Sequence, residues 1–134
     1  MQIRNLLLSH MDRQDRDTLC EMSDVVDVPC RAKLELPNNA PKYVYFLESG
    51  MASLVYRARG DCTAEVALVG REGCTGCSTI LGVGSTPQAT IMQVQGVARR
   101  IACVDFSDAI NRSRGLHAFL LRFVHTQLIQ RDET

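Results

Sequence analysis

The segment that decides the fold reads GREGCTGCSTILG at positions 70–82 and continues as TPQAT at positions 86–90. Three glycines fall within its first seven residues, so the backbone is free to turn tightly and to present N–H groups. Residues rich in β-forming side chains lie on both sides of it, at 63–69 and 90–94. This pattern predicts a loop between strands that meets a ligand.

Outward from this loop, short β-rich runs alternate with turn residues over the whole middle of the chain. Short strands at near-regular spacing predict a β-sandwich or a jelly-roll barrel. The expected strands lie at 25–28, 34–36, 43–47, 51–56, 63–69, 90–94 and 97–104.

Helices are predicted at both ends of this barrel. Residues 5–22 have a helical pattern, in which Asp12 and Asp15 suit a cap and a first turn. A short second helix is expected to open at 105–108, with Asp105 or Ser107 as its cap.

The length of 134 residues fits one domain over residues 1–134. We expect an N-terminal helical lid at 1–24, a β-barrel at 25–104 and C-terminal helices at 105–134. The predicted class is mainly β with flanking helices (α+β).

The last helix carries two apolar stripes at helical spacing. One stripe consists of Leu116, Leu120 and Phe123, and the other of Leu121, Val124 and Leu128. One stripe is enough to cover the barrel, so the second is predicted to pack against another copy of the chain as a homodimer. The alternative is one wide stripe absorbed by the chain's own barrel.

Composition excludes several classes of protein. The formal net charge is zero, so nothing draws the chain as a whole toward nucleic acid or anionic membrane. No apolar run approaches the roughly 20 residues of a membrane span, and the three leucines near the N-terminus are too few for a signal peptide. A cytoplasmic protein without membrane contact is expected, with its six cysteines as free thiols.

Three runs together resemble a known family: YVYF at 43–46, Ser49-Gly50, and EVALVGREG at 65–73. They resemble the effector domain of Crp/Fnr-type bacterial transcription regulators, and the likeness covers nearly the whole chain. It implies the cyclic-nucleotide-binding fold, a double-stranded β-helix (jelly-roll) barrel with N-terminal helices and a long C-terminal helix.

The resemblance also implies a sensor that acts on DNA through a winged helix-turn-helix domain. No stretch of this chain offers a basic recognition helix, so DNA contact is expected only through a domain that this chain does not contain. The alternative function is a stand-alone ligand-binding or thiol redox-sensing protein without a DNA role.

The family's phosphate-binding cassette is degenerate in this sequence. Gly76 matches its glycine, but Cys77 replaces its glutamate and Gln88 its arginine, with Ala89 and Thr90 following. A lost charge-assisted hydrogen bond costs about 1.5–3 kcal/mol, so cyclic AMP is not expected to bind tightly and no cofactor is predicted. The candidate effector residues are Gly73, Gly76, Cys77, Ser78, Thr79, Gln88, Ala89, Thr90, Arg99 and Arg100.

Two of these residues, Arg99 and Arg100, are neighbours in the last strand and so point to opposite faces. One is expected to face solvent. The other would approach the pocket, where it would bind an anionic effector or pair with an acid such as Glu65.

Redox chemistry is a second hypothesis for the glycine segment. Cys74 and Cys77 have the Cys-x-x-Cys spacing of redox pairs and of half a zinc site. Zinc needs two further ligands, and no second close Cys or His pair exists, so no metal is predicted. The pair is then either a thiol sensor or two small residues that fill a tight loop.

The three histidines bear on enzyme and haem chemistry. A metal-dependent barrel enzyme needs histidines on its inward-facing strands, whereas His10, His117 and His125 lie in predicted helices. We therefore expect no enzyme. Haem ligation by His117 and His125 is the weaker alternative to ordinary surface histidines.

Overall fold

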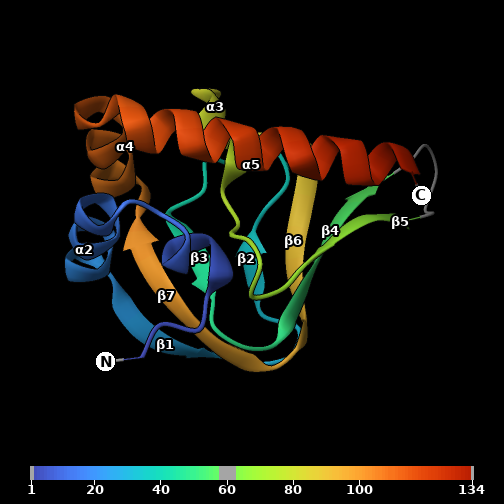
Figure 1. Cartoon of the computed structure of the whole chain (residues 1–134). Helices are drawn as coiled ribbons and strands as arrows, with labels where there is room; N and C mark the ends of the chain where they lie inside the picture. The colour runs from blue at the N-terminus through green and yellow to red at the C-terminus, as the bar shows by residue number, and fades with distance from the viewer. Residues whose placement is uncertain (1, 58–62, 134) are drawn as a thin grey trace.

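The computed structural model describes residues 2–57 and 63–133. Within these ranges, seven strands form two antiparallel sheets with the strand orders β1-β7-β3 and β2-β6-β4-β5 (Figure 1). The strands are β1 (Asp24–Val28), β2 (Lys33–Glu35), β3 (Tyr43–Leu47), β4 (Met51–Arg57), β5 (Thr63–Val69), β6 (Gln88–Val94) and β7 (Gly96–Ala102). The predicted mainly β architecture with flanking helices is confirmed.

The helices lie on one end and one side of these sheets. They are α1 (Leu6–Ser9), α2 (Arg13–Met22), α3 (Cys77–Leu81), α4 (Cys103–Arg112) and α5 (Arg114–Glu133). Figure 1 shows α5 crossing the end of the barrel, while α2 and α4 lie beside β7. Asp12 caps α2 as predicted, because its carboxylate accepts a hydrogen bond from the backbone N–H of Gln14 at 3.3 Å.

Two hydrophobic cores result from the alternation of side chains along the strands. In β3, Val44 and Phe46 point into a core shared with the helices, where Phe46 meets Phe106 edge to face with ring centroids 6.0 Å apart. Leu47 belongs to a second core between the two sheets, together with Leu54. Strand β3 thus contributes buried side chains to the cores on both of its faces.

The start of α4 differs from the prediction. The helix begins at Cys103, so Val104 is helical rather than part of the last strand. Neither Asp105 nor Ser107 is the cap: Ala102 occupies that position without a side-chain bond, and Asp105 lies in the first turn. The physical reason is that β3 begins at Tyr43, opposite Ala102, so residues beyond Ala102 have no strand partner.

The apolar face of α5 also differs in part from the two predicted stripes. Leu116 and Leu120 are buried in the helix-side core as predicted, with Phe123 packed against them. Val124 lies in the same core with 6% of its surface exposed, which corrects its assignment to the dimer stripe. Positions four apart stay on nearly the same helix face, so the inward stripe continues from Leu120 to Val124. Leu121 is 39% exposed, and the Leu128 side chain lies outside the described residues.

Candidate functional site

The glycine loop, residues 70–76, is hydrogen-bonded to the edge of β3. The Thr75 N–H donates to the Tyr45 carbonyl at 3.0 Å, and the Tyr45 N–H donates to the Thr75 hydroxyl at 3.1 Å. Cys74 forms an isolated antiparallel bridge with Phe46. These bonds hold the loop over the helix-side face of the barrel and leave its last residue, Gly76, facing inward.

Gly76 ends the loop in a conformation that requires glycine. Its φ of +81° is left-handed, and a Cβ atom there would lie 2.8 Å from Cγ2 of Val44. Its N–H donates to Oε1 of Glu35 at 2.7 Å. A backbone donor of the predicted cradle is therefore already bound by a carboxylate of the same chain.

Glu35 is buried, with 7% of its surface exposed, and polar groups surround it. Thr90 lies directly opposite it in the β2–β6 pairing, and Ser78 lies in the first turn of α3. Both of these side chains are buried. The Thr90 hydroxyl lies next to the Glu35 carboxylate, whereas the Ser78 hydroxyl completes no hydrogen bond within the described residues. Burial raises the pKa of the Glu35 carboxyl, while the Gly76 N–H and the nearby Thr90 hydroxyl oppose that rise.

The sequence did not reveal Glu35 because it lies at an irregularity. Strict alternation would place Leu34 and Leu36 on one face and Glu35 on the solvent face. A register shift between Lys33 and Glu35 breaks this pattern: Leu34 and Glu35 are both buried, whereas Leu36 is exposed. A lone acid between two leucines, next to a turn cluster, was the only signal in the sequence.

The remaining cassette residues connect α3 to the C-terminal helices. The Cys77 thiol donates to Oε1 of Gln127 in α5 at 3.6 Å, and the Thr79 hydroxyl donates to Sγ of Cys103 in α4, also at 3.6 Å. Gln88 and Ala89 open β6 and are half-buried. Gln88 shares a strand face with Thr90, two residues on.

Arg100 lies on the face of β7 opposite to Arg99. Its guanidinium carbon lies 4.3 Å from the centre of the Tyr43 ring, in cation–π geometry. Nη2 lies 3.9 Å from the Asp24 carboxylate, which is largely exposed. Burial raises the pKa of the Tyr45 hydroxyl, and the charge of Arg100 opposes that rise.

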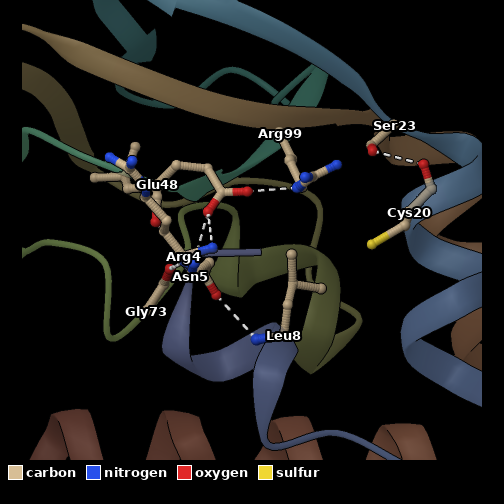
Figure 2. Close-up of polar contacts among 9 residues, drawn as sticks. Arg4, Asn5, Leu8, Cys20, Ser23, Glu48, Gly73 and Arg99 are labelled. Carbon is tan, nitrogen blue, oxygen red and sulfur yellow. Dashed lines mark hydrogen bonds and ion pairs between the residues drawn. The ribbon is translucent and has the colours of Figure 1, made fainter. Parts of the chain in front are cut away.

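Arg99 is 3% exposed and forms a buried ion pair in which its Nε donates to Oε1 of Glu48 (Figure 2). One of the two arginines therefore pairs with an acid as expected, and that acid is Glu48, in the β3–β4 turn. The Glu65 side chain lies outside the described residues. Arg99 therefore holds the fold together, and we do not assign it to effector binding.

Asn5 joins this ion pair to the glycine loop (Figure 2). Its N–H donates to Oε2 of Glu48 at 2.6 Å, and its side-chain amide donates to the carbonyls of Leu47 at 2.7 Å and Gly73 at 2.9 Å. Its side-chain oxygen accepts from the N–H of Leu8 and so caps α1. One buried side chain thus links the N-terminal segment, the β3–β4 turn and the loop.

Cys74 and Cys77 are thiols in different surroundings. Cys74 is fully buried, and this burial raises its pKa well above the ordinary value, with the neighbouring Cys77 and Glu35 adding to the rise. Because the thiolate is the reactive form, Cys74 is in an environment that disfavours redox chemistry. Cys77 is half-buried.

The side chains that could ligate a metal or a haem do not gather into a metal site within the described residues. In the part of the chain that the structure describes, no group of three His, Cys, Asp or Glu side chains is close enough to hold a metal ion. His117 contacts the Ile80 carbonyl through Nε2 at 3.0 Å, whereas His125 is exposed on α5. Among the helices of residues 2–57 and 63–133, none combines the length and apolar character needed to cross a bilayer.

Comparison with known proteins shows which fold this chain has. No protein-family model and no curated protein sequence matches the chain. Solved structures do match it. Catabolite activator protein from Thermus thermophilus superimposes with a TM-score of 0.76 at 16% identity, covering 94% of this chain and 59% of that one. The present chain thus spans little more than half of that protein.

Two shorter structures match over most of their own length. A cyclic nucleotide-binding domain from Methylobacillus flagellatus gives a TM-score of 0.73 at 11% identity, covering 97% of this chain and 77% of that one. The sensor domain of the transcriptional regulator DNR from Pseudomonas aeruginosa gives 0.70 at 15% identity, with coverages of 95% and 85%. The chain therefore has the cyclic-nucleotide-binding fold, the fold of the effector domains that its sequence resembles.

Proposed function

We propose that this chain is the effector-sensing domain of a Crp/Fnr-like transcription regulator whose pocket does not bind cyclic AMP tightly. The observation that carries the proposal is the bond from the Gly76 N–H to Glu35. By the sequence resemblance, Gly76 stands at the glycine of the phosphate cassette. Cys77 and Gln88 replace the two charged residues, and Glu35 occupies a donor that a cyclic phosphate would need.

The loop is well placed to act on α5. A Cβ atom on Gly73 would come within 2.9 Å of Cζ of Phe123, so the loop packs tightly against that helix. Cys77 adds a polar contact to Gln127 of the same helix. An effector that shifts the loop would favour one position of α5 over another, which is the coupling that a sensor needs.

The outer face of α5 is the proposed dimer contact. Ala118, Leu121, His125 and Ile129 are all exposed along this helix. They recur at intervals of three and four residues and so form one face. We place a second copy of the chain there, with DNA contacted through a domain that lies outside this chain.

Light scattering tests the dimer through its mass. We expect the chain to have twice its 14.9 kDa mass, and Leu121→Asp to return it to a single chain. Val104→Asp is the matched control, because Val104 is exposed on α4, away from the proposed contact. A monomeric parent chain, or a Leu121→Asp variant that stays dimeric, contradicts the assignment.

A fusion tests the regulatory role. The chain is joined through Thr134 to a DNA-binding domain that occupies its operator only as a dimer, upstream of a reporter. We expect repression by the parent fusion and by Val104→Asp, and loss of repression by Leu121→Asp. Equal repression by all three contradicts dimerisation through the outer face of α5.

A further inference from the structure

We propose that Glu35 binds the glycine loop from within the chain and makes this site select against anions, so that its effector is a neutral or cationic molecule rich in hydrogen-bond donors. The proposal deepens the proposed function and rests on it, since it takes the glycine loop to be the effector site. Its basis is the contact between Glu35 and Gly76, together with the neighbouring Thr90 hydroxyl and the buried, unpartnered Ser78 hydroxyl.

The Glu35–Gly76 contact is fixed by both of its partners. Gly76 is held in the left-handed region by its fit against Val44, which aims its N–H inward. Glu35 is held by the register shift in β2, which turns it from the solvent face to the interior. The resulting N···O distance of 2.7 Å is short, as expected when a carboxylate accepts. An external anion would have to displace this carboxylate to reach the same N–H.

Electrostatics around Glu35 oppose a second anion. The polar groups that act on the carboxyl are the Gly76 N–H and the Thr90 hydroxyl, both uncharged. The titratable groups that feel its charge are the Cys74 and Cys103 thiols, whose pKa values it helps to raise. No lysine or arginine is among these groups. In a buried site, two like charges without a cation between them repel strongly.

The same surroundings suit a ligand that donates hydrogen bonds. A carboxylate has about four acceptor sites, and the Gly76 N–H and the Thr90 hydroxyl engage only part of those on Glu35. The Ser78 hydroxyl is buried and completes no hydrogen bond within the described residues. Buried polar groups normally have partners. Free acceptor sites on Glu35, with the unused Ser78 hydroxyl two residues beyond its Gly76 partner, fit an N–H- or O–H-bearing ligand.

Amide NMR at pH 8 tests this selection, with inorganic phosphate as the probe. In the parent chain, the Gly76 amide resonance is expected not to respond to phosphate. In Glu35→Ala the Gly76 N–H is free. We therefore expect phosphate to shift this resonance in a saturable way, with an apparent affinity at least about tenfold tighter than that of the parent chain. Glu35→Gln keeps the side-chain volume without the charge and answers the question if the alanine variant does not fold.

Glu72→Gln is the matched control. Glu72 also accepts a bond from the glycine loop, from the Gly70 N–H at 3.0 Å, but it is exposed. This variant should behave like the parent chain. Equal phosphate response in the parent chain and the Glu35 variants overturns the proposal, as does a folded Glu35 variant that gives no response.

The two proposals fail in different ways. Tight binding of cyclic AMP by the parent chain contradicts the proposed function. Weak or absent cyclic AMP binding, combined with an unresponsive Glu35 variant, contradicts only the role of Glu35.

Discussion

The carboxylate of Glu48 and the guanidinium of Arg99 form an ion pair that is almost fully buried beneath the N-terminal segment. Such a pair stabilises a fold only while both partners are present, because removing one leaves a buried charge uncompensated. The backbone N–H groups of Arg4 and Asn5 complete the set of bonds to Glu48. The pair therefore connects three separate segments of the chain.

We predict that Arg99→Ala lowers the free energy of unfolding by about 3–5 kcal/mol. Urea denaturation measures this loss. Arg100→Ala is the control. Arg100 is partly exposed, its one ion pair in the described residues is with the exposed Asp24, and it lies over the Tyr43 ring, so a smaller loss is expected there. Equal losses in the two variants would show that the buried pair is not the stabilising element.

Replacing Asn5 is also predicted to destabilise the fold. Asn5→Ala removes both the cap of α1 and the bond to Gly73, so the free energy of unfolding should fall by about 1–3 kcal/mol. Hydrogen exchange should also become faster at Leu8, whose N–H loses its acceptor. Asn39→Ala removes an exposed side-chain bond to Pro37 and serves as the control, with little expected change. Unchanged exchange at Leu8 would contradict the linking role of Asn5.

Glu35 predicts a dependence of stability on pH. Burial raises its pKa in the folded chain, so the folded state binds more protons than the unfolded state between the two pKa values. The contribution of Glu35 to the free energy of unfolding therefore falls as pH rises through that window and stays level on either side. Urea denaturation at several pH values, with Glu35→Gln beside the parent chain, isolates this contribution. Parallel pH profiles for the two proteins would refute it.

Replacing Gly76 is predicted to lower stability for two reasons, a steric clash and backbone strain. Gly76→Ala forces a Cβ toward Val44 and strains a left-handed backbone, so it should destabilise by about 2–4 kcal/mol. Gly82 has a similar φ of +76° but no atom within 4 Å of a Cβ, so Gly82→Ala carries the backbone strain alone. Thermal unfolding of both variants separates the two costs. Equal destabilisation would mean that Val44 yields and that the loop is not tightly seated.

Local patterns in the sequence were enough to predict much of the fold. The run of β-forming residues at 43–47 predicted β3, and the helical spacing of Leu116 and Leu120 predicted the inward face of α5. Asp12 was found as a cap because capping depends on neighbours a few residues away. In each case the signal and the contact lie within one element.

The missed features depend on contacts between distant segments. The bulge that turns Glu35 inward is set by the pairing of β2 with β6, and the partner of Arg99 lies 51 residues away in the chain. The start of α4 depends on where the pairing of β3 with β7 stops. A single sequence shows charged residues but does not show which strand positions bring them together.

Calorimetric titration with cyclic AMP tests the central claim most directly, since it asks whether this fold still accepts the ligand of its cassette. With Glu35 on the Gly76 N–H and without the charged cassette residues, we predict no saturable heat at ligand concentrations up to about 100 μM. A dissociation constant in the micromolar range or tighter would contradict the account.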